Sequence, residues 1–312
     1  MALCQTSRMS VVPIVAVVGP TASGKTHLSL DLAARLGGEV VNTDAMQVYR
    51  GMDIGTAKLP GAERRGIQHH LLDTHTVRDP VTVAEFQQQA RAVIAELRGR
   101  GTTPVLVGGS ALYTRAVVDR FEFPGTDPEV RARLETDLTE LGPHALHERL
   151  RRLDPEAAAR VLPENGRRIV RALEVIEITG RPFTASLPRL EYVEPRTIQV
   201  GVEIDRPTLD ARIERRVDHM FEAGLVEEVE RLIGEGLADG RTASRAIGYR
   251  EVAAYLAGDL SLDAARERTL VATRRFARRQ GSWFRRDPRI VWVRYDDPER
   301  QEKAVAAVRS LD

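Results

Sequence analysis

The chain has 312 residues, of which 42% are hydrophobic and 29% charged, a composition typical of a soluble globular protein with one large or two modest domains. Because the formal net charge is only +1, any nucleic-acid-binding surface must be a local patch of basic side chains. The single cysteine, Cys4, excludes a disulfide framework and a cysteine zinc site. The apolar run from Val11 to Val18 is too short to span a membrane, so we expect a core strand there, no membrane partner and a cytoplasmic protein.

Residues 19–26 follow the pattern of a phosphate-binding loop. An apolar strand pattern precedes them and a helical pattern over 28–36 follows. Backbone N–H groups, the helix N-terminus and a lysine can therefore converge on phosphate oxygens, while the Thr26 hydroxyl reaches Mg²⁺. The alternative is a chance match in a glycine-rich turn. The loop predicts a diphosphate or triphosphate ligand, but kinases, NTPases and group transferases all share it. Its residues are Gly19, Pro20, Thr21, Ala22, Ser23, Gly24, Lys25 and Thr26.

The first hundred residues alternate between strand and helix patterns. Strands are expected at 15–18, 39–42 and 104–107 and a helix at 83–98, whereas the glycine-containing segment 51–70 is expected to be irregular. Such alternation is typical of an α/β fold, in which helices cover a parallel sheet and sites lie at the carboxyl ends of the strands.

A helical block interrupts the α/β pattern. From Asp127 to about Thr184 the apolar spacing is helical, and strand patterns return only at 197–204 and 290–293. We therefore expect a core in two parts with an inserted helical domain. The expected boundaries are 1–122 and 191–312 for the core and 123–190 for the insertion.

Polar side chains follow two of the expected strands. Asp44 follows the second strand and Gly108-Gly109-Ser110 the third, so parallel pairing brings both to the edge that carries the phosphate loop. A carboxylate there can take a proton from a nucleophile or hold a metal, and the serine offers a hydroxyl. Alternatively, Asp44 caps a turn and the glycines form a plain strand-to-helix turn. His69 and His70 are adjacent and diverge on any regular element, so we expect a structural role for them.

The C-terminal third contains a basic and aromatic segment, which we call the arginine patch. Arginine with interleaved aromatic residues is typical of surfaces that bind RNA or single strands, and a solvated helix face is the alternative. With a smaller basic cluster in the helical block and the phosphate loop, it suggests two anionic ligands. The arginine patch contains Arg274, Arg275, Arg278, Arg279, Arg285, Arg286, Arg289 and Arg294 with Phe276, Trp283 and Phe284; the smaller cluster contains Arg167, Arg168 and Arg171.

Together these motifs are similar to those of the tRNA dimethylallyltransferase (tRNA isopentenyltransferase) family, over nearly the whole chain. The block at 44–58, Asp-Ala-Met-Gln-Val-Tyr-Arg-Gly-Met-Asp-Ile-Gly-Thr-Ala-Lys, makes the resemblance specific. The other matching segments are the loop at 19–26, His-His-Leu-Leu-Asp at 69–73, Val-Gly-Gly-Ser-Ala-Leu-Tyr at 107–113, Asp-Pro-Glu-Val-Arg at 127–131, Arg-Ala-Leu-Glu-Val at 171–175, Ala-Ile-Gly-Tyr-Arg-Glu at 246–251 and Arg-Arg-Gln-Gly-Ser-Trp-Phe at 278–284.

The resemblance implies a tRNA-modifying prenyltransferase with a P-loop NTPase-like parallel sheet core and an inserted helical, tRNA-binding domain. Its reaction would transfer a dimethylallyl group from dimethylallyl diphosphate to N6 of adenosine 37, next to the anticodon, and release diphosphate. The implied cofactor is Mg²⁺ and the implied partner is the tRNA anticodon stem-loop; we expect a monomer.

The resemblance also implies roles for single residues. The phosphate loop and Arg216 would bind the diphosphate, and Thr26 would bind the metal. Asp44 would be the general base, with Ser110 and Arg131 as further residues of the catalytic region. The implied tRNA contacts are Asp44, Ala45, Met46, Gln47, Arg167, Arg168, Arg171, Arg245, Gly248, Tyr249, Arg278, Arg279, Gln280, Trp283 and Arg285.

Three positions depart from the family pattern. Ala45 replaces a serine and removes one possible RNA contact, Ser110 replaces a threonine but keeps the hydroxyl, and Gln68 replaces a proline. Two other functions are consistent with parts of the sequence. A P-loop small-molecule kinase would share the loop and the aspartate base, but it would not need the arginine patch. An RNA-binding module with a relic loop would not need Asp44 beside that loop.

Overall fold

The computed structural model describes residues 12–183 and 189–311. The chain divides into two compact units, which we call the core unit (1–119 with 192–312) and the helical unit (Arg120–Glu191). Cys4, Val11 and Thr184 lie outside the described residues. Of the helices in the described ranges, none is long and apolar enough to cross a membrane.

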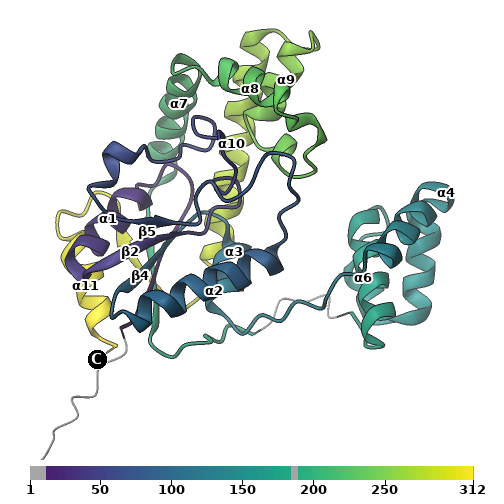
Figure 1. The fold of residues 1–312 in the computed structure, drawn as a ribbon, viewed down its shortest axis with the longest axis horizontal. Coiled ribbons are helices and arrows are strands. Elements are labelled where there is room, and N and C mark those ends of the chain that lie inside the picture. The colour runs from purple at the N-terminus through teal and green to yellow at the C-terminus, as the bar shows by residue number, and fades with distance from the viewer. Residues whose placement is uncertain (1–11, 184–188, 312) are drawn as a thin grey trace, which may run out of the picture. The chain divides into compact units, whose positions relative to one another are not determined.

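A six-stranded sheet forms the middle of the core unit (Figure 1). Its order is β3-β2-β4-β1-β5-β6 and every neighbouring pair is parallel, as predicted. Because the carboxyl ends of parallel strands meet at one edge, the segments that follow β1, β2 and β4 lie beside one another. The strands are β1 (Ile14–Val18), β2 (Gly38–Asn42), β3 (His69–His70), β4 (Thr103–Val107), β5 (Thr197–Glu203) and β6 (Ile290–Arg294).

Alternate residues of β1 enter two apolar clusters on opposite faces of the sheet. Ala16 and Val18 pack with residues of α2, α3, α8 and α9, whereas Val15 and Val17 pack with residues of α1 and α11. Both faces therefore need a helical cover, which explains the continuous apolar run of this strand. The α-helices of the core unit are α1 (Lys25–Leu36), α2 (Val83–Gly99), α3 (Ala111–Val118), α7 (Arg206–Glu222), α8 (Leu225–Gly234), α9 (Tyr249–Leu256), α10 (Leu262–Phe284) and α11 (Arg300–Arg309); two of its short 3-10 helices are η2 (Leu237–Asp239) and η3 (Ala243–Arg245).

The helical unit has an apolar core of its own, which includes Leu134, Leu150 and Leu173. Its longest helix is interrupted at Gly142, whose φ is 79°, directly before Pro143. Proline lacks the N–H that would continue the helix, so the kink follows from the sequence. The helices of this unit are α4 (Pro128–Leu153), α5 (Pro155–Arg160) and α6 (Gly166–Thr179).

The prediction that residues 51–70 are irregular is wrong in part. The segment contains the 3-10 helix η1 (Gly61–Arg64) and ends in β3, which adds a strand to the sheet beside β2. A two-residue strand is too short to give a periodic sequence pattern. His70 Nε2 lies 2.6 Å from a Glu39 carboxylate oxygen and His69 Nδ1 lies 2.9 Å from the Ile67 carbonyl oxygen, contacts that support a structural role for both histidines.

Candidate active site

The phosphate loop joins β1 to α1 through a backbone that needs its glycines. Gly19 and Gly24 have φ angles of 141° and 99°. A Cβ atom on Gly19 would come within 3.2 Å of the Val202 carbonyl oxygen. Within the described residues, α1 begins at Lys25 without a side-chain cap. Its first N–H groups therefore have no side-chain acceptor and remain open to an anion.

Basic side chains lie against this loop. Lys25 Nζ donates a hydrogen bond of 2.7 Å to the Pro20 carbonyl oxygen. Arg216, on α7, donates one of 2.7 Å to the Thr21 hydroxyl. Arg212, one helical turn earlier, donates to the Ser23 carbonyl oxygen at 3.5 Å and packs its guanidinium over the ring of Tyr295, 4.6 Å from the ring centre. The loop is thus held by cations of α7 from a distant part of the chain.

The charge on Lys25 depends on pH close to neutrality. Burial, and next the positive charge of Arg216, lower the pKa of Lys25 from 10.5 to about 7, although the Asp44 carboxylate acts in the opposite direction. Burial also lowers the pKa of Arg216, but a guanidinium keeps its proton in proteins. Asp44 is the carboxylate that acts on both cations, and the surplus of positive charge favours the binding of an anion.

A cavity of about 790 Å³ opens at this edge of the sheet. Thr26 lines it, and no cluster of three or more acidic, histidine or cysteine side chains in the described structure could hold a metal alone. The lining is basic, and several of its side chains come from one face of α7. Arg212, Arg215 and His219 were not predicted from the sequence, although their spacing of three and four residues indicates a shared helix face. The basic lining comprises Lys25, His27, His69, Arg212, Arg215, Arg216, His219 and Arg300.

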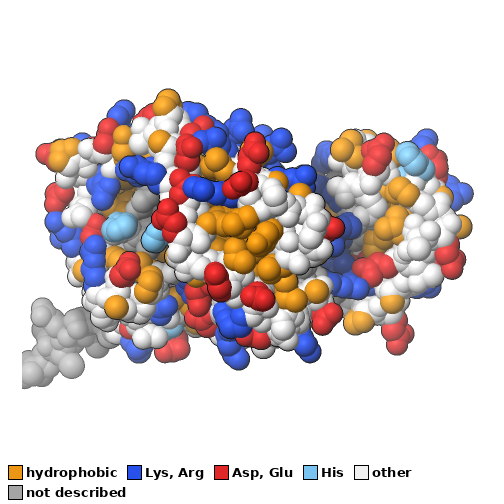
Figure 2. Space-filling model, turned by 90° about the horizontal axis from the view of Figure 1, so that it is seen from above, with side chains coloured by type: hydrophobic (Ala, Val, Ile, Leu, Met, Phe, Trp, Pro, Cys, Tyr) orange, Lys and Arg blue, Asp and Glu red, His pale blue; other side chains and the backbone are white. Residues whose placement is uncertain are grey.

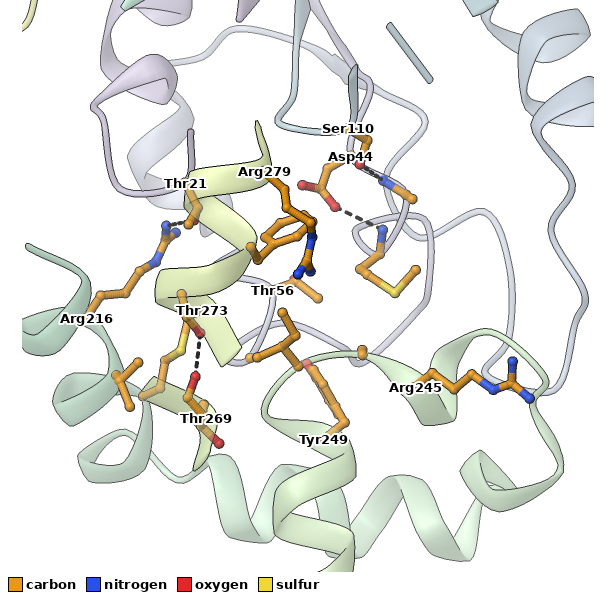
Figure 3. Close-up of a pocket in the computed structure, with 18 residues that line it drawn as sticks. Thr21, Asp44, Thr56, Ser110, Arg216, Arg245, Tyr249, Thr269, Thr273 and Arg279 are labelled. Atoms are coloured by element: carbon orange, nitrogen blue, oxygen red, sulfur yellow. Dashed lines mark hydrogen bonds between the residues drawn. The ribbon is translucent and has the colours of Figure 1, made fainter. Parts of the chain in front are cut away.

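A second cavity, of about 360 Å³, adjoins the first (Figure 3). Its apolar side chains come from α7, α10, the turn after β2 and the segment before α9. Two threonines of α10 also line it, but Thr269 and Thr273 each donate a 2.8 Å hydrogen bond to a carbonyl oxygen of their own helix. Their hydroxyls are therefore satisfied without a ligand. The apolar lining includes Met46, Val217, Met220, Ile247 and Phe276; Thr21, Asp44, Thr56, Arg216 and Phe276 line both cavities.

Asp44 and Ser110 lie together where the two strand-end turns meet. One Asp44 carboxylate oxygen accepts the Met46 N–H at 2.9 Å, so this residue does hold a turn. Among the described residues no donor meets its other oxygen, and Figure 3 shows Asp44 extending into the same space as Arg279. The Ser110 hydroxyl oxygen accepts the Ala45 N–H at 3.3 Å. The hydroxyl thus stands directly beside the carboxylate turn.

Gln280 does not lie on the surface, although the family resemblance implied an RNA contact. It is 5% exposed. Its side-chain oxygen accepts the Thr21 N–H at 2.8 Å and its side-chain nitrogen donates to the Gly109 carbonyl oxygen at 2.9 Å. Gln280 therefore joins α10 to the phosphate loop and to the turn after β4.

Tyr249 and Gly248 are also internal in this structure. The Tyr249 side chain is 0% exposed and its hydroxyl donates to Glu228 at 2.5 Å. Burial, and then the adjacent carboxylate, raise the pKa of Tyr249, so the phenol keeps its proton and remains a donor. Gly248 has a φ of 91° and its N–H donates to Glu251, which fixes the start of α9. Only Arg245 of this predicted group is exposed.

The arginine patch divides into paired and unpaired side chains. Arg274 pairs with Glu214 of α7, and Arg289 pairs with Asp119 and Asp287. The unpaired arginines are exposed and have no acidic partner in the described structure. Arg294 is also paired, with Asp296, and Trp283 is half-buried. Arg279 lies 5.9 Å from the ring centre of Phe276. The unpaired set is Arg275, Arg278, Arg279, Arg285 and Arg286.

Basic and acidic side chains are interspersed on the face of the core unit that Figure 2 shows. The surface there is not a continuous basic field, as expected for a formal net charge of +1. Because the net charge of the whole protein is so small, affinity for a polyanion would depend on particular arginines.

The remaining predicted residues belong to the helical unit. Arg131 and Arg171 both pair with the buried Glu174, and Arg171 also donates to the Pro124 and Gly125 carbonyl oxygens. Burial alone would raise the pKa of Glu174, but hydrogen bonds from the two arginines lower it. Arg131 and Arg171 thus anchor the start of α4 to α6. Arg167 and Arg168 are exposed.

Comparisons with known proteins point to one family over most of the chain. The family model of IPP transferases matches residues 47–287. The tRNA dimethylallyltransferase of Nocardioides sp. (strain ATCC BAA-499 / JS614) is 78% identical, over 95% of this chain and 96% of its own. The tRNA dimethylallyltransferase of Thermobifida fusca is 59% identical, over 95% and 94%.

Two solved structures share the fold. The full-length tRNA isopentenylpyrophosphate transferase of Bacillus halodurans is 40% identical and covers 96% of both chains with a TM-score of 0.70. A eukaryotic dimethylallyltransferase acting on tRNA is 25% identical, covers 96% of this chain and 78% of its own, and gives a TM-score of 0.80.

Proposed function

Because the chain belongs to the IPP transferase family, we propose that it transfers a dimethylallyl group from dimethylallyl diphosphate to N6 of adenosine 37 of tRNA and releases diphosphate. The observation that carries this proposal is the adjacency of a basic cavity and a largely apolar one. The two share Thr21, Asp44 and Arg216. A donor with a charged diphosphate head and a short hydrocarbon tail matches this division of polarity.

The basic cavity would bind the diphosphate. The N–H groups of the phosphate loop, Lys25 and Arg216 would share its negative charge, and leaving-group departure is easier when that charge is neutralised. Mg²⁺ usually takes one or two protein ligands and completes its shell with phosphate oxygens and water, so the Thr26 hydroxyl fits such a site. The ion would supply further charge neutralisation to the leaving diphosphate.

Asp44 would accept the proton that N6 loses. Adenine N6 is a weak nucleophile because its lone pair is delocalised into the ring. The site must therefore hold N6 in line with C1 of the prenyl group. The carboxylate oxygen that no described donor meets is available for this proton. Ser110 would act beside it by holding the Ala45 N–H. For reaction, the adenine must leave the anticodon-loop stack.

The tRNA would be gripped by exposed basic side chains. In the core unit these are Arg278, Arg279, Arg285 and Arg245. The ring of Trp283 would stack on a base of the RNA, and Ala45, Met46 and Gln47 would contact the RNA beside Asp44. In the helical unit Arg167 and Arg168 are exposed, and Arg171 donates to two carbonyl oxygens of the same unit. Arg131 as a catalytic-region residue, the monomeric state and the cytoplasmic location stay predictions.

One assay separates this proposal from a P-loop kinase. The purified chain is incubated with unmodified tRNA, Mg²⁺ and either ATP or dimethylallyl diphosphate, and the RNA is analysed by mass spectrometry. A mass gain of one five-carbon unit at the adenosine next to the anticodon, with the second donor only, is expected. The proposal fails if phosphate is transferred from ATP or if neither donor modifies the RNA. The two relatives described above are both named tRNA dimethylallyltransferase, which supports the prenyl reaction over the kinase.

A further inference from the structure

Gln280 is the point at which α10 meets both strand-end turns of the site. Its side-chain oxygen accepts from Thr21 in the phosphate loop, and its side-chain nitrogen donates to Gly109 in the turn after β4. The two contacts use the acceptor and the donor of one amide, 2.8 and 2.9 Å away. Only a primary amide of this length offers both at once in that geometry.

Each contact continues to a side chain of the proposed chemistry. Thr21, held through its N–H by Gln280, accepts Arg216 on its hydroxyl at 2.7 Å. Gly109 immediately precedes Ser110, whose hydroxyl oxygen accepts the N–H of the residue after Asp44. One amide thus sits between the arginine of the diphosphate side and the carboxylate turn of the acceptor side.

The residues around Gln280 hold its side-chain amide in this position. A Cβ atom on Gly109 would lie 2.2 Å from the Gln280 side-chain nitrogen, so glycine is required for the amide to approach. The side chain is almost fully buried, and a buried amide that lost either partner would leave a polar group unsatisfied. Its neighbour Arg279 is exposed and lines the smaller cavity, whereas Gln280 is buried against the two turns.

We propose that Gln280 is a positioning residue that sets the separation between the diphosphate-binding loop and the Asp44–Ser110 turn. The inference rests on the proposed function and assigns Gln280 no contact with tRNA. In-line transfer requires the donor carbon and the N6 atom to be held at a fixed spacing, and a misplacement of 1 Å can cost about 100-fold in rate. Gln280 acts on that spacing through Thr21 and Gly109.

The test uses two substitutions that separate the two hydrogen bonds. Gln280→Met keeps the length of the side chain and removes both bonds, whereas Gln280→Glu keeps the acceptor for Thr21 but removes the donor to Gly109. Gln199→Met is the matched control, because Gln199 is also buried and donates to Tyr192 and Asp287 away from the site. For each full-length variant we would measure kcat, KM for dimethylallyl diphosphate, affinities for tRNA and for inorganic pyrophosphate, and Tm.

Gln280→Met should lower kcat by about 100-fold and weaken pyrophosphate binding, with tRNA affinity unchanged. Gln280→Glu should also lose kcat, because the donor to Gly109 is gone and a negative charge then faces the phosphate loop. Gln199→Met should lower Tm and leave kcat alone. The inference is overturned if Gln280→Met weakens tRNA binding with normal kcat, or if it changes only Tm in the way that Gln199→Met does.

The inference can still be tested if a variant does not fold or if the proposed function is wrong. If Gln280→Met does not fold, Gly109→Ala provides a second route, since its methyl group would displace the Gln280 amide; a normal kcat in that variant contradicts the proposal. If the wild-type chain does not prenylate tRNA, the proposed function fails. The pyrophosphate measurement then still decides whether Gln280 organises the loop.

Discussion

Arg216 donates a 2.7 Å hydrogen bond to the hydroxyl of Thr21, which lies 195 positions earlier in the chain. The bond fixes a guanidinium of α7 against the phosphate loop. Together with burial, this positive charge lowers the pKa of Lys25 to about 7. The site therefore holds crowded positive charge, and an anion that binds there would relieve the repulsion between the two cations.

Lys25→Ala should weaken the binding of dimethylallyl diphosphate by about 10- to 100-fold, because a charge-assisted hydrogen bond is lost. The affinity for tRNA should stay the same, since the exposed arginines lie elsewhere. Both affinities can be measured by calorimetry or filter binding. An unchanged donor affinity would mean that the loop does not hold the donor.

The donor affinity of the wild type should fall as the pH rises above about 7, because Lys25 then loses its proton in the free enzyme. Above the phosphate ionisation near about pH 6 the diphosphate charge is constant, so Kd should increase by up to about tenfold per pH unit. Lys25→Arg keeps its charge and should remove this dependence. A wild-type Kd that is constant from pH 7.5 to about 9 contradicts the prediction.

The same shift affects the stability of the ligand-free protein in the opposite direction. Between pH 7 and 10.5 the unfolded chain binds the Lys25 proton and the folded chain does not. The contribution of this group to the free energy of unfolding therefore rises with pH across that window. Thermal unfolding at two pH values, compared with Lys25→Met, isolates the contribution.

Asp44→Asn separates the two roles of this residue. The amide oxygen can still accept the Met46 N–H and hold the turn, but the side chain can no longer take a proton from N6. Turnover should fall by about 10²–10⁴-fold with tRNA affinity and Tm close to the wild type. Asp44→Ala should lose turnover as well and also lower Tm. Near-normal turnover of the asparagine variant would reduce Asp44 to a turn residue.

Local sequence patterns predict the parts of this site that are local in the chain. The phosphate loop is one strand, one turn and one helix, and Asp44 directly follows a strand, so their shared edge follows from parallel pairing. The contacts of Gln280 are not local, since they join positions 259 and 171 residues apart. A motif that contains Gln280 cannot reveal whether the side chain faces solvent or the sheet.

The charge pattern of the arginine patch has the same limit. The segment itself contains a single acidic residue, so the local sequence predicts that nearly every arginine is free to bind RNA. Glu214 and Asp119, which pair with Arg274 and Arg289, come from 60 and 170 positions earlier. Burial and distant partners decide which arginines remain free, and neither is encoded in local composition.

Tyr249→Phe should leave tRNA affinity unchanged, because the ring is buried and the hydroxyl faces Glu228. The same carboxylate accepts the backbone N–H groups of Asp53 and Ile54, so it would lose one of its donors. A hydrogen bond to a charged group contributes about 1.5–3 kcal/mol, and urea unfolding should show a loss of that order. Weaker tRNA binding at full stability would instead support the RNA contact implied by the family resemblance.

Arg279→Ala should weaken tRNA binding and also reduce its salt dependence. Arg279 is exposed on α10 without an acidic partner in the described part of the chain. If it neutralises an RNA phosphate, its loss should reduce the slope of log K against log salt by about one. The affinity for inorganic pyrophosphate, which would bind in the other, basic cavity, should not change.

Arg266→Ala is the matched control for this substitution. Arg266 is an exposed arginine of the same helix, but it pairs with Asp218 at 2.6 Å. Its removal should leave the salt slope of tRNA binding as it is, because an exposed ion pair contributes little and releases no RNA counter-ion. The measurement is tRNA affinity at several salt concentrations for both variants and the wild type. Parallel slopes for Arg279→Ala and the wild type would remove Arg279 from the RNA-binding surface, and the same comparison can then be made for Arg278 and Arg285.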